Sequence, residues 1–143
     1  MDKLFFRRLF SRPQKPAGET TETRAGHGDA EAQFSLGVKF AQEGAAQDYA
    51  QAAQWYLKAA DLGDAGAQYN IGMKHHRASL DGLPEAAPES RIQAYKWFRL
   101  AAAQGYRGSE AAWAFVSLAM TREDVADGGR RIAAFVPAQA NQA

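Results

Sequence analysis

The sequence contains no cysteine, so the chain has no disulfide framework and no thiolate metal site. It also lacks a run of about 20 apolar residues, the length that crosses a bilayer. Its first apolar run, Leu4 to Phe6, is interrupted by Arg7 and Arg8, whereas a signal peptide needs about 7–15 uninterrupted apolar residues. The missing cysteine fits a reducing compartment, and we expect a cytoplasmic protein.

The chain also has little net charge, because 17 Lys and Arg residues stand against 16 Asp and Glu residues. Residues 1–26 hold six of the basic residues but only three of the acidic ones, so the remaining body is weakly acidic. Nucleic-acid binding needs a concentrated basic surface. The charge distribution therefore argues against a nucleic-acid partner.

The basic excess lies in an N-terminal segment, residues 2–12, whose two faces differ. On a helical wheel one side is aromatic and aliphatic, and the other is mainly basic. The candidate binding residues of this segment are Phe5, Phe6, Arg7, Arg8, Leu9 and Phe10. A basic amphipathic helix suits the inner face of an anionic membrane or the groove of a partner. A disordered soluble tail and a helix docked on its own domain are the alternatives.

A stretch rich in Pro, Thr, Glu, Gly and Gln runs from Arg12 to Gly28. Its composition, with prolines at positions 13 and 16, predicts a flexible linker. We therefore expect residues 1–27 to form an arm and linker, followed by a folded domain over residues 28–136 and a disordered tail over residues 137–143.

The body of the chain repeats itself. Residues 28–63 align with residues 64–105, at an offset of 35 in the first half and 42 in the second half. The difference of seven residues is an insertion in the stretch 79–89, which contains Pro and Gly. An insertion confined to a connection, with both flanks in register, indicates a repeat of two helices.

Helix ends are marked in both units. Asp29 and Asp64 are expected to N-cap the first helices, and Asp48 and Ser90 the second helices. The C-terminal ends of the second helices carry glycines at 63 and 105, which can adopt the left-handed conformation.

Within the helices, small residues recur at matching positions. Gly37 and Gly72 align, and we expect them to allow close helix contact, because an interior glycine otherwise costs about 1 kcal/mol relative to alanine. Trp55 and Trp97 also align, and we expect both to be buried between helices.

The pattern resembles the Sel1-like repeat, a relative of the tetratricopeptide repeat. The resemblance rests on A-x-x-x-L-G at residues 32–37 and on D-x-x-x-A-x-x-W-Y-x-K-A-A-x-x-G at residues 48–63. The second unit departs from it with Leu100 in place of lysine and with His75 where the first unit has the aromatic Phe40. The family implies an all-α, right-handed α-solenoid of antiparallel helix pairs, with two repeats and a C-terminal capping helix pair over residues 106–136. Thr121 and Asp124 form a capping-box pattern at the start of the last helix.

Catalytic patterns are weak. His75 and His76 are adjacent, so on a helix their rings point about 100° apart, whereas zinc ligands on one helical face stand four residues apart. We expect one of these rings to be packed and the other to lie in solvent. No serine sits in a nucleophile elbow, and no glycine-rich phosphate loop is present. We therefore expect neither enzymatic activity, nor a cofactor, nor a bound metal.

The first helices carry an apolar stripe, made of Phe34, Val38, Tyr69, Met73 and Phe115. The resemblance places first helices on the concave face, where this stripe would be the floor of a peptide groove. Its expected edges are Glu31, Gln42, His76 and Arg77. The alternative is that the stripe is simply core. We expect an adaptor that presents this surface to a protein or peptide, or else a peripheral membrane protein anchored by residues 2–12.

Overall fold

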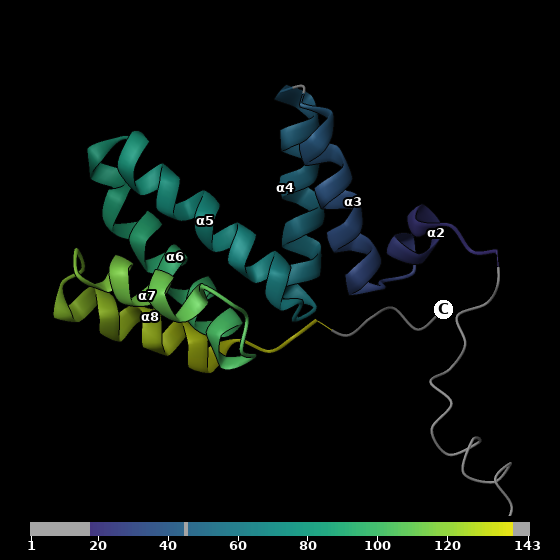
Figure 1. The fold of residues 1–143 in the computed structure, drawn as a ribbon. Coiled ribbons are helices and arrows are strands. Elements are labelled where there is room, and N and C mark those ends of the chain that lie inside the picture. The colour runs from purple at the N-terminus through teal and green to yellow at the C-terminus, as the bar shows by residue number, and fades with distance from the viewer. Residues whose placement is uncertain (1–17, 45, 139–143) are drawn as a thin grey trace, which may run out of the picture.

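The computed structural model describes residues 18–44 and 46–138. Every regular element in this part of the chain is helical, and the helices pack one after another as an α-solenoid (Figure 1). The elements are α2 (Thr21–Gly26), α3 (Ala30–Glu43), α4 (Ala46–Asp61), α5 (Ala65–Asp81), η1 (Pro84–Ala86), α6 (Ala87–Ala103), α7 (Ser109–Ser117) and α8 (Arg122–Ala134). No helix among the described residues is long and apolar enough to cross a membrane.

The two repeats are the helix pairs α3/α4 and α5/α6. Within each pair the helices approach closely at a glycine, as predicted. A Cβ added at Gly37 would lie 2.5 Å from the Tyr56 ring, and one added at Gly72 would lie 2.6 Å from the Phe98 ring. The glycine hydrogen therefore leaves the space that the aromatic ring of the second helix fills.

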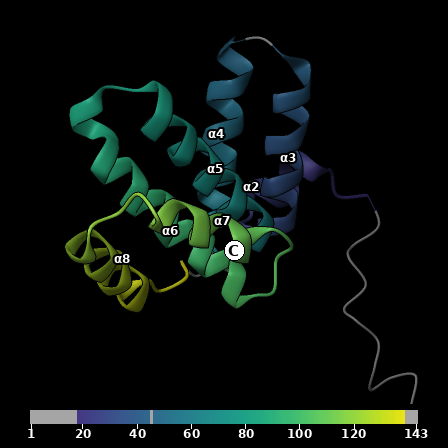
Figure 2. The same cartoon turned by 60° about the vertical axis from the view of Figure 1, so that its left-hand side comes forward.

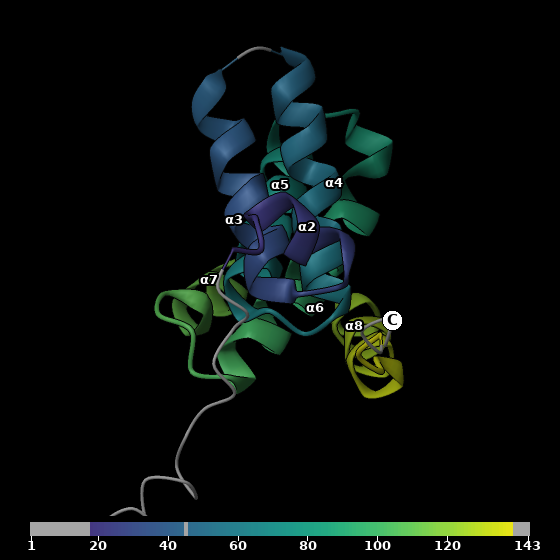
Figure 3. The same ribbon diagram turned by 90° about the vertical axis from the view of Figure 1, so that its right-hand side faces the viewer.

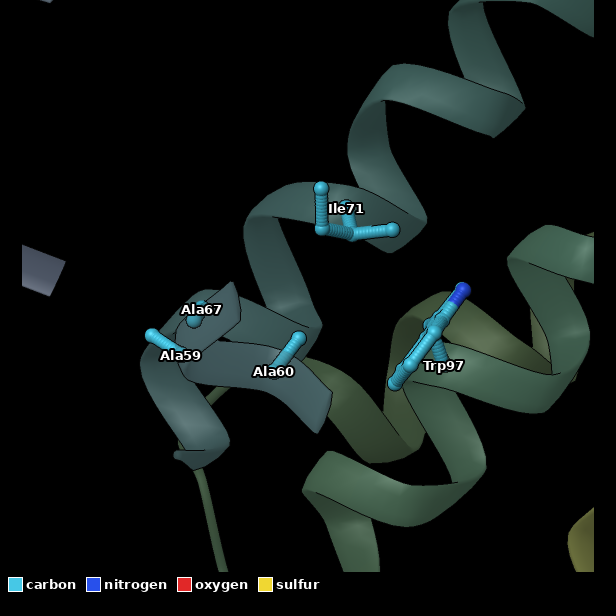
Figure 4. Packing of buried hydrophobic residues seen from close by; sticks show 5 residues of the cluster. All are labelled: Ala59, Ala60, Ala67, Ile71 and Trp97. Carbon is cyan, nitrogen blue, oxygen red and sulfur yellow. The ribbon is translucent and has the colours of Figure 1, made fainter. Parts of the chain in front are cut away.

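A shared core joins the two repeats. It is made of Ala59, Ala60, Ala67, Ile71 and Trp97 (Figure 4). The alanines at the end of α4 let the start of α5 come close, and Trp97 of α6 closes the cluster with only 4% of its surface exposed. Trp55 is different from its counterpart, because it is half-buried beside Ala32 and Leu36, so burial of both tryptophans was only partly correct.

The caps of the first helices are as predicted, since Asp29 accepts a hydrogen bond from the Ala32 N–H and Asp64 from the Ala67 N–H. The predicted caps of the second helices are wrong. Asp48 lies inside the first turn of α4, and α6 begins at Ala87, three residues before Ser90. Pro88 explains the early start, because proline is well suited to the first turn, where its missing N–H leaves no bond unmade.

The closing helices lie on opposite sides of α6 (Figure 3). Figure 2 also separates α7 from α8, which have few contacts with each other. The predicted capping box is present, with Thr121 and Asp124 bonded reciprocally. Gly128 lets α8 approach α6, because a Cβ there would lie 2.6 Å from the Tyr95 ring.

Two segments expected to lie outside the folded domain contact it. The predicted linker contains α2, which begins after the last proline and buries Ala25 against Ala32 and Leu36 of α3. In the predicted tail, the Ala138 N–H donates a hydrogen bond of 2.7 Å to the Asp61 carbonyl, one of the carbonyls left free at the end of α4. The expected linker is therefore wrong over residues 21–26, whereas the tail over residues 137–143 stays a prediction.

Candidate functional site

The stripe residues of α3 lie between helices. The Phe34 ring packs 5.7 Å from the Tyr56 ring, and a Cβ at Gly66 of α5 would lie 3.1 Å from it. Val38, one turn further along, is half-buried. Glu31 and Gln42, the predicted edges, are exposed.

The stripe residues of α5 are packed in a similar way. Tyr69 lies between two aromatic rings, 5.5 Å from Phe98 and 5.3 Å from Tyr106. Met73 packs against the cluster around Phe98 and Val116. Most of the stripe thus contributes to helix packing, and its predicted role in binding a partner stays a prediction.

A groove of about 400 Å³ opens between the first helix pair and α5, and we call it the α4/α5 groove. It contains two of the predicted residues, Met73 and Arg77. Among the described residues, its lining is Ala41, Tyr49, Ala52, Ala53, Tyr56, Asn70, Ile71, Met73, Lys74 and Arg77. The small residues of α4 leave space for a side chain, and Tyr49 is 57% exposed.

The α4/α5 groove has cations at its α5 side. Among the described residues, the side chains of Lys74 and Arg77 form no hydrogen bond and no ion pair. Both are exposed. A groove with apolar walls and unpaired cations can hold an apolar side chain and a carboxylate together.

A second depression of about 280 Å³, the α5/α7 hollow, contains a different predicted residue, His76. Its lining is His76, Ser79, Leu80, Arg91, Phe115, Val116, Leu118 and Ala119. The His76 ring lies 5.9 Å from the Phe115 ring, edge to face. His76 is therefore half-buried, although one histidine of the pair was expected to lie in solvent. The predicted binding residues are divided, because Met73 and Arg77 line the α4/α5 groove and His76 lines the α5/α7 hollow.

A third hollow, of about 470 Å³, lies where the C-terminal segment returns to α4. Burial raises the pKa of Asp61, while nearby Lys96 opposes the shift. The pKa of Lys96 is lowered, first by burial, and its ammonium group lies 4.3 Å from the centre of the Trp97 ring. The Lys96 ammonium group also lies 5.6 Å from the centre of the Phe135 ring in the C-terminal segment.

Arg131 of α8 is bound on the same side of the molecule. It donates hydrogen bonds to Glu89 of α6, at 3.0 Å, and to Asp127, at 2.9 Å. The bond from Arg131 is the main cause that lowers the pKa of Glu89. Because Glu89 and Arg131 are held together, they attach α8 to α6.

Among the described residues, no three His, Cys, Asp or Glu side chains gather as a metal site. His75 is half-buried, and burial is the first cause that lowers its pKa. The candidate residues of the arm, 5–10, lie outside the described residues. Sequence reasoning missed Tyr49, Leu80 and Leu118, although the repeat offsets of 35 and 42 relate Leu118 to His76 and Ala41.

A family model for the Sel1 repeat matches residues 30–64 and again residues 65–106. No curated protein and no solved structure matches the chain. Sel1 repeats are helical repeats that generally mediate protein–protein interactions, and proteins built from them are typically non-enzymatic scaffolds. The two matches cover more than half of the 143 residues and coincide with the helix pairs α3/α4 and α5/α6, so the chain belongs to the Sel1 repeat family.

Proposed function

We propose that this protein is an adaptor that presents its helical-repeat surface to a peptide or protein partner. The observation that supports this is the α4/α5 groove, which is lined by Met73, Arg77 and the exposed Tyr49. Apolar walls with a few polar groups are typical of sites that bind an extended or helical segment. Aromatic and arginine side chains are also the residues that most often dominate binding energy.

The groove crosses the joint between the repeats, because α4 belongs to the first repeat and α5 to the second. A bound segment would therefore contact both repeats at once. A buried core that includes Ala59 and Ala60 of α4 and Ala67 and Ile71 of α5 joins the two walls. Binding would then require little rearrangement, which lowers its cost.

The test is affinity capture with the full chain, followed by binding measurements with each purified candidate. Tyr49→Ala should weaken binding at least about tenfold, in the range of an aromatic hot spot. Leu57→Ala is the matched control, because Leu57 lies on the same helix, is 45% exposed and does not line the groove. Equal binding by both variants would remove the groove from the function.

The segregated faces of residues 2–12 support a second candidate function, peripheral attachment to the inner face of a membrane. Anionic lipid would contribute about 1 kcal/mol per basic residue near the surface. Co-sedimentation with anionic and neutral vesicles should separate the full chain from a chain that starts at Ala17. If the arm attaches the protein, only the full chain should bind anionic vesicles, and salt should weaken this binding. Equal behaviour of the two chains would contradict attachment through the arm. In either case we propose a cytoplasmic location.

A further inference from the structure

The first helices of the array carry three positions that recur at the repeat offsets. They are Phe34, Tyr69 and Ala111; Val38, Met73 and Phe115; and Ala41, His76 and Leu118. In α3 and α5 all of these side chains are half-buried. In α7, and at Leu118 just beyond it, all three are exposed. The same face of the helix is thus covered twice and open once.

In the first two helices this face contacts the next first helix or the turn before it. The Phe34 ring lies against Gly66, at the start of α5. Tyr69 repeats this contact at Gly108, just before α7, where an added Cβ would lie 3.7 Å from the tyrosine oxygen. His76 then meets the Phe115 ring of α7. This face is therefore the surface through which each repeat contacts the next one.

On α7, no following helix among the described residues covers this face. Phe115 is 64% exposed and Leu118 is 83% exposed. The last helix does not cover them, because α8 packs on the other side of α6 (Figure 3). The opposite end of the array is closed, since α2 buries Ala25 against α3 and turns Glu22 and Thr23 to solvent.

Solenoid ends usually present a polar outer surface, so exposed apolar side chains at one end indicate an interaction surface. Leu80 of α5 extends this apolar surface. It is 68% exposed and lines the α5/α7 hollow together with Phe115 and Leu118. The charged side chain that lines the hollow is Arg91, which forms no hydrogen bond or ion pair with another described residue.

We propose that the open face of α7 binds an amphipathic helix of a protein partner, which stacks there as the next first helix and places an acidic side chain against Arg91. Helical geometry follows from the two preceding helices, since Phe34 contacts the start of the next first helix and the equivalent Tyr69 contacts the turn before α7. An acidic partner follows from the unpaired guanidinium group. The basic segment 2–12 lacks this complementarity, and a second copy of the chain would bring a second Arg91 to the interface.

The experiment selects binders to the full chain from a phage-displayed library of helix-forming peptides randomised on one face. The expected peptides combine an apolar stripe with an excess of Asp and Glu over Lys and Arg. A selected peptide, synthesised alone, should bind Phe115→Ser/Leu118→Ser and Arg91→Gln at least about tenfold more weakly than the parent chain. Because Phe115 and Leu118 are exposed, the double variant should keep the parent circular dichroism spectrum and melting temperature.

Two matched controls accompany these variants. Leu83→Ser replaces an apolar side chain of similar exposure, 67%, that lies outside the hollow, and Arg122→Gln replaces an exposed arginine of α8. Both should bind the peptide like the parent chain. The proposal is overturned if no peptide is enriched, if the peptides show no acidic bias, or if the double variant binds them unchanged.

The other occupants give different results. Sedimentation velocity would show a dimer that Phe115→Ser/Leu118→Ser abolishes if the face binds a second copy. A synthetic peptide of residues 2–12 would bind the parent chain but not the double variant if the face receives the arm. Either result overturns the proposal. Neither bears on the adaptor function at the α4/α5 groove, which Tyr49→Ala tests separately.

Discussion

The absence of a Cβ atom at three glycines lets neighbouring helices pack closely. At Gly37, Gly72 and Gly128, a Cβ would lie 2.5–2.6 Å from an aromatic ring of a neighbouring helix. Phe98, the ring at Gly72, is 1% exposed and has no room to move aside. The glycines are therefore kept by steric fit, although glycine is a poor helix former.

Gly72→Ala should lower the melting temperature. Overpacking costs about 1–3 kcal/mol, which exceeds the gain of about 1 kcal/mol in helix propensity. Gly129→Ala is the control, because a Cβ there meets nothing within 4 Å, and it should raise the melting temperature. A rise for both variants would show that Phe98 does not confine position 72.

The two aligned tryptophans should differ in their contribution to stability. Trp97→Ala removes a side chain that is 4% exposed and central to the joint between repeats, so we expect a loss of about 3–5 kcal/mol in the free energy of unfolding. Trp55→Ala should cost clearly less, because Trp55 is half-buried. Urea unfolding of both variants measures the difference, and equal losses would contradict the difference in burial between the two side chains.

At the scale of elements, the sequence predicted what local chemistry determines. Asp29 and Asp64 cap their helices through bonds to residues three positions on, and these are visible in the sequence. The short helix α2 was missed because six residues are stable as a helix only when Ala25 is buried by α3, a tertiary contact.

The insertion between the two helices of the second repeat was located correctly, but its form was not predictable. Part of it lengthens α5 to 17 residues, compared with 14 for α3, and part forms η1. The longer α5 carries Leu80 out to the α5/α7 hollow. The apolar stripe could be predicted as a helical face but not as a surface, because its exposure depends on which helix comes next.

His75 should make the packing of α5 sensitive to pH. Burial lowers its pKa below the ordinary value of 6.5, with Lys74 and Lys96 acting in the same direction and Glu89 against it. The folded state therefore favours the neutral ring. The stability that this contributes is complete above about pH 6.5 and is lost as the pH falls through that value, until the folded pKa is passed.

His75→Phe, which restores the aromatic residue found at Phe40 in the first repeat, should reduce this loss. Urea unfolding of the parent chain and the variant between about pH 5 and 8, where histidine titrates, measures it. The stability of the variant relative to that of the parent chain should therefore increase as the pH falls. A constant difference would show that His75 is not the group responsible.

The C-terminal segment connects the last helix with the first repeat. The Phe135 ring packs 5.8 Å from the Trp97 ring, edge to face, and the Ala138 N–H donates to the Asp61 carbonyl at the end of α4. The last described residues of the chain thus reach the first repeat. They cross the same joint that the α4/α5 groove crosses, so the segment helps to fix the angle between the repeats.

Phe135→Ala should therefore weaken the contact between the repeats as well as the anchoring of α8. Because Phe135 is only half-buried, we expect a loss of about 1–3 kcal/mol, below that of a fully buried phenylalanine. Val136→Ala is the matched control. Val136 is the next residue along the chain, it is 80% exposed, and its side chain should contribute almost nothing to stability. Hydrogen exchange should show faster exchange at the end of α4 in Phe135→Ala alone. Unchanged exchange there, together with lower global stability, would mean that Phe135 holds α8 to α6 without connecting the last helix to the first repeat.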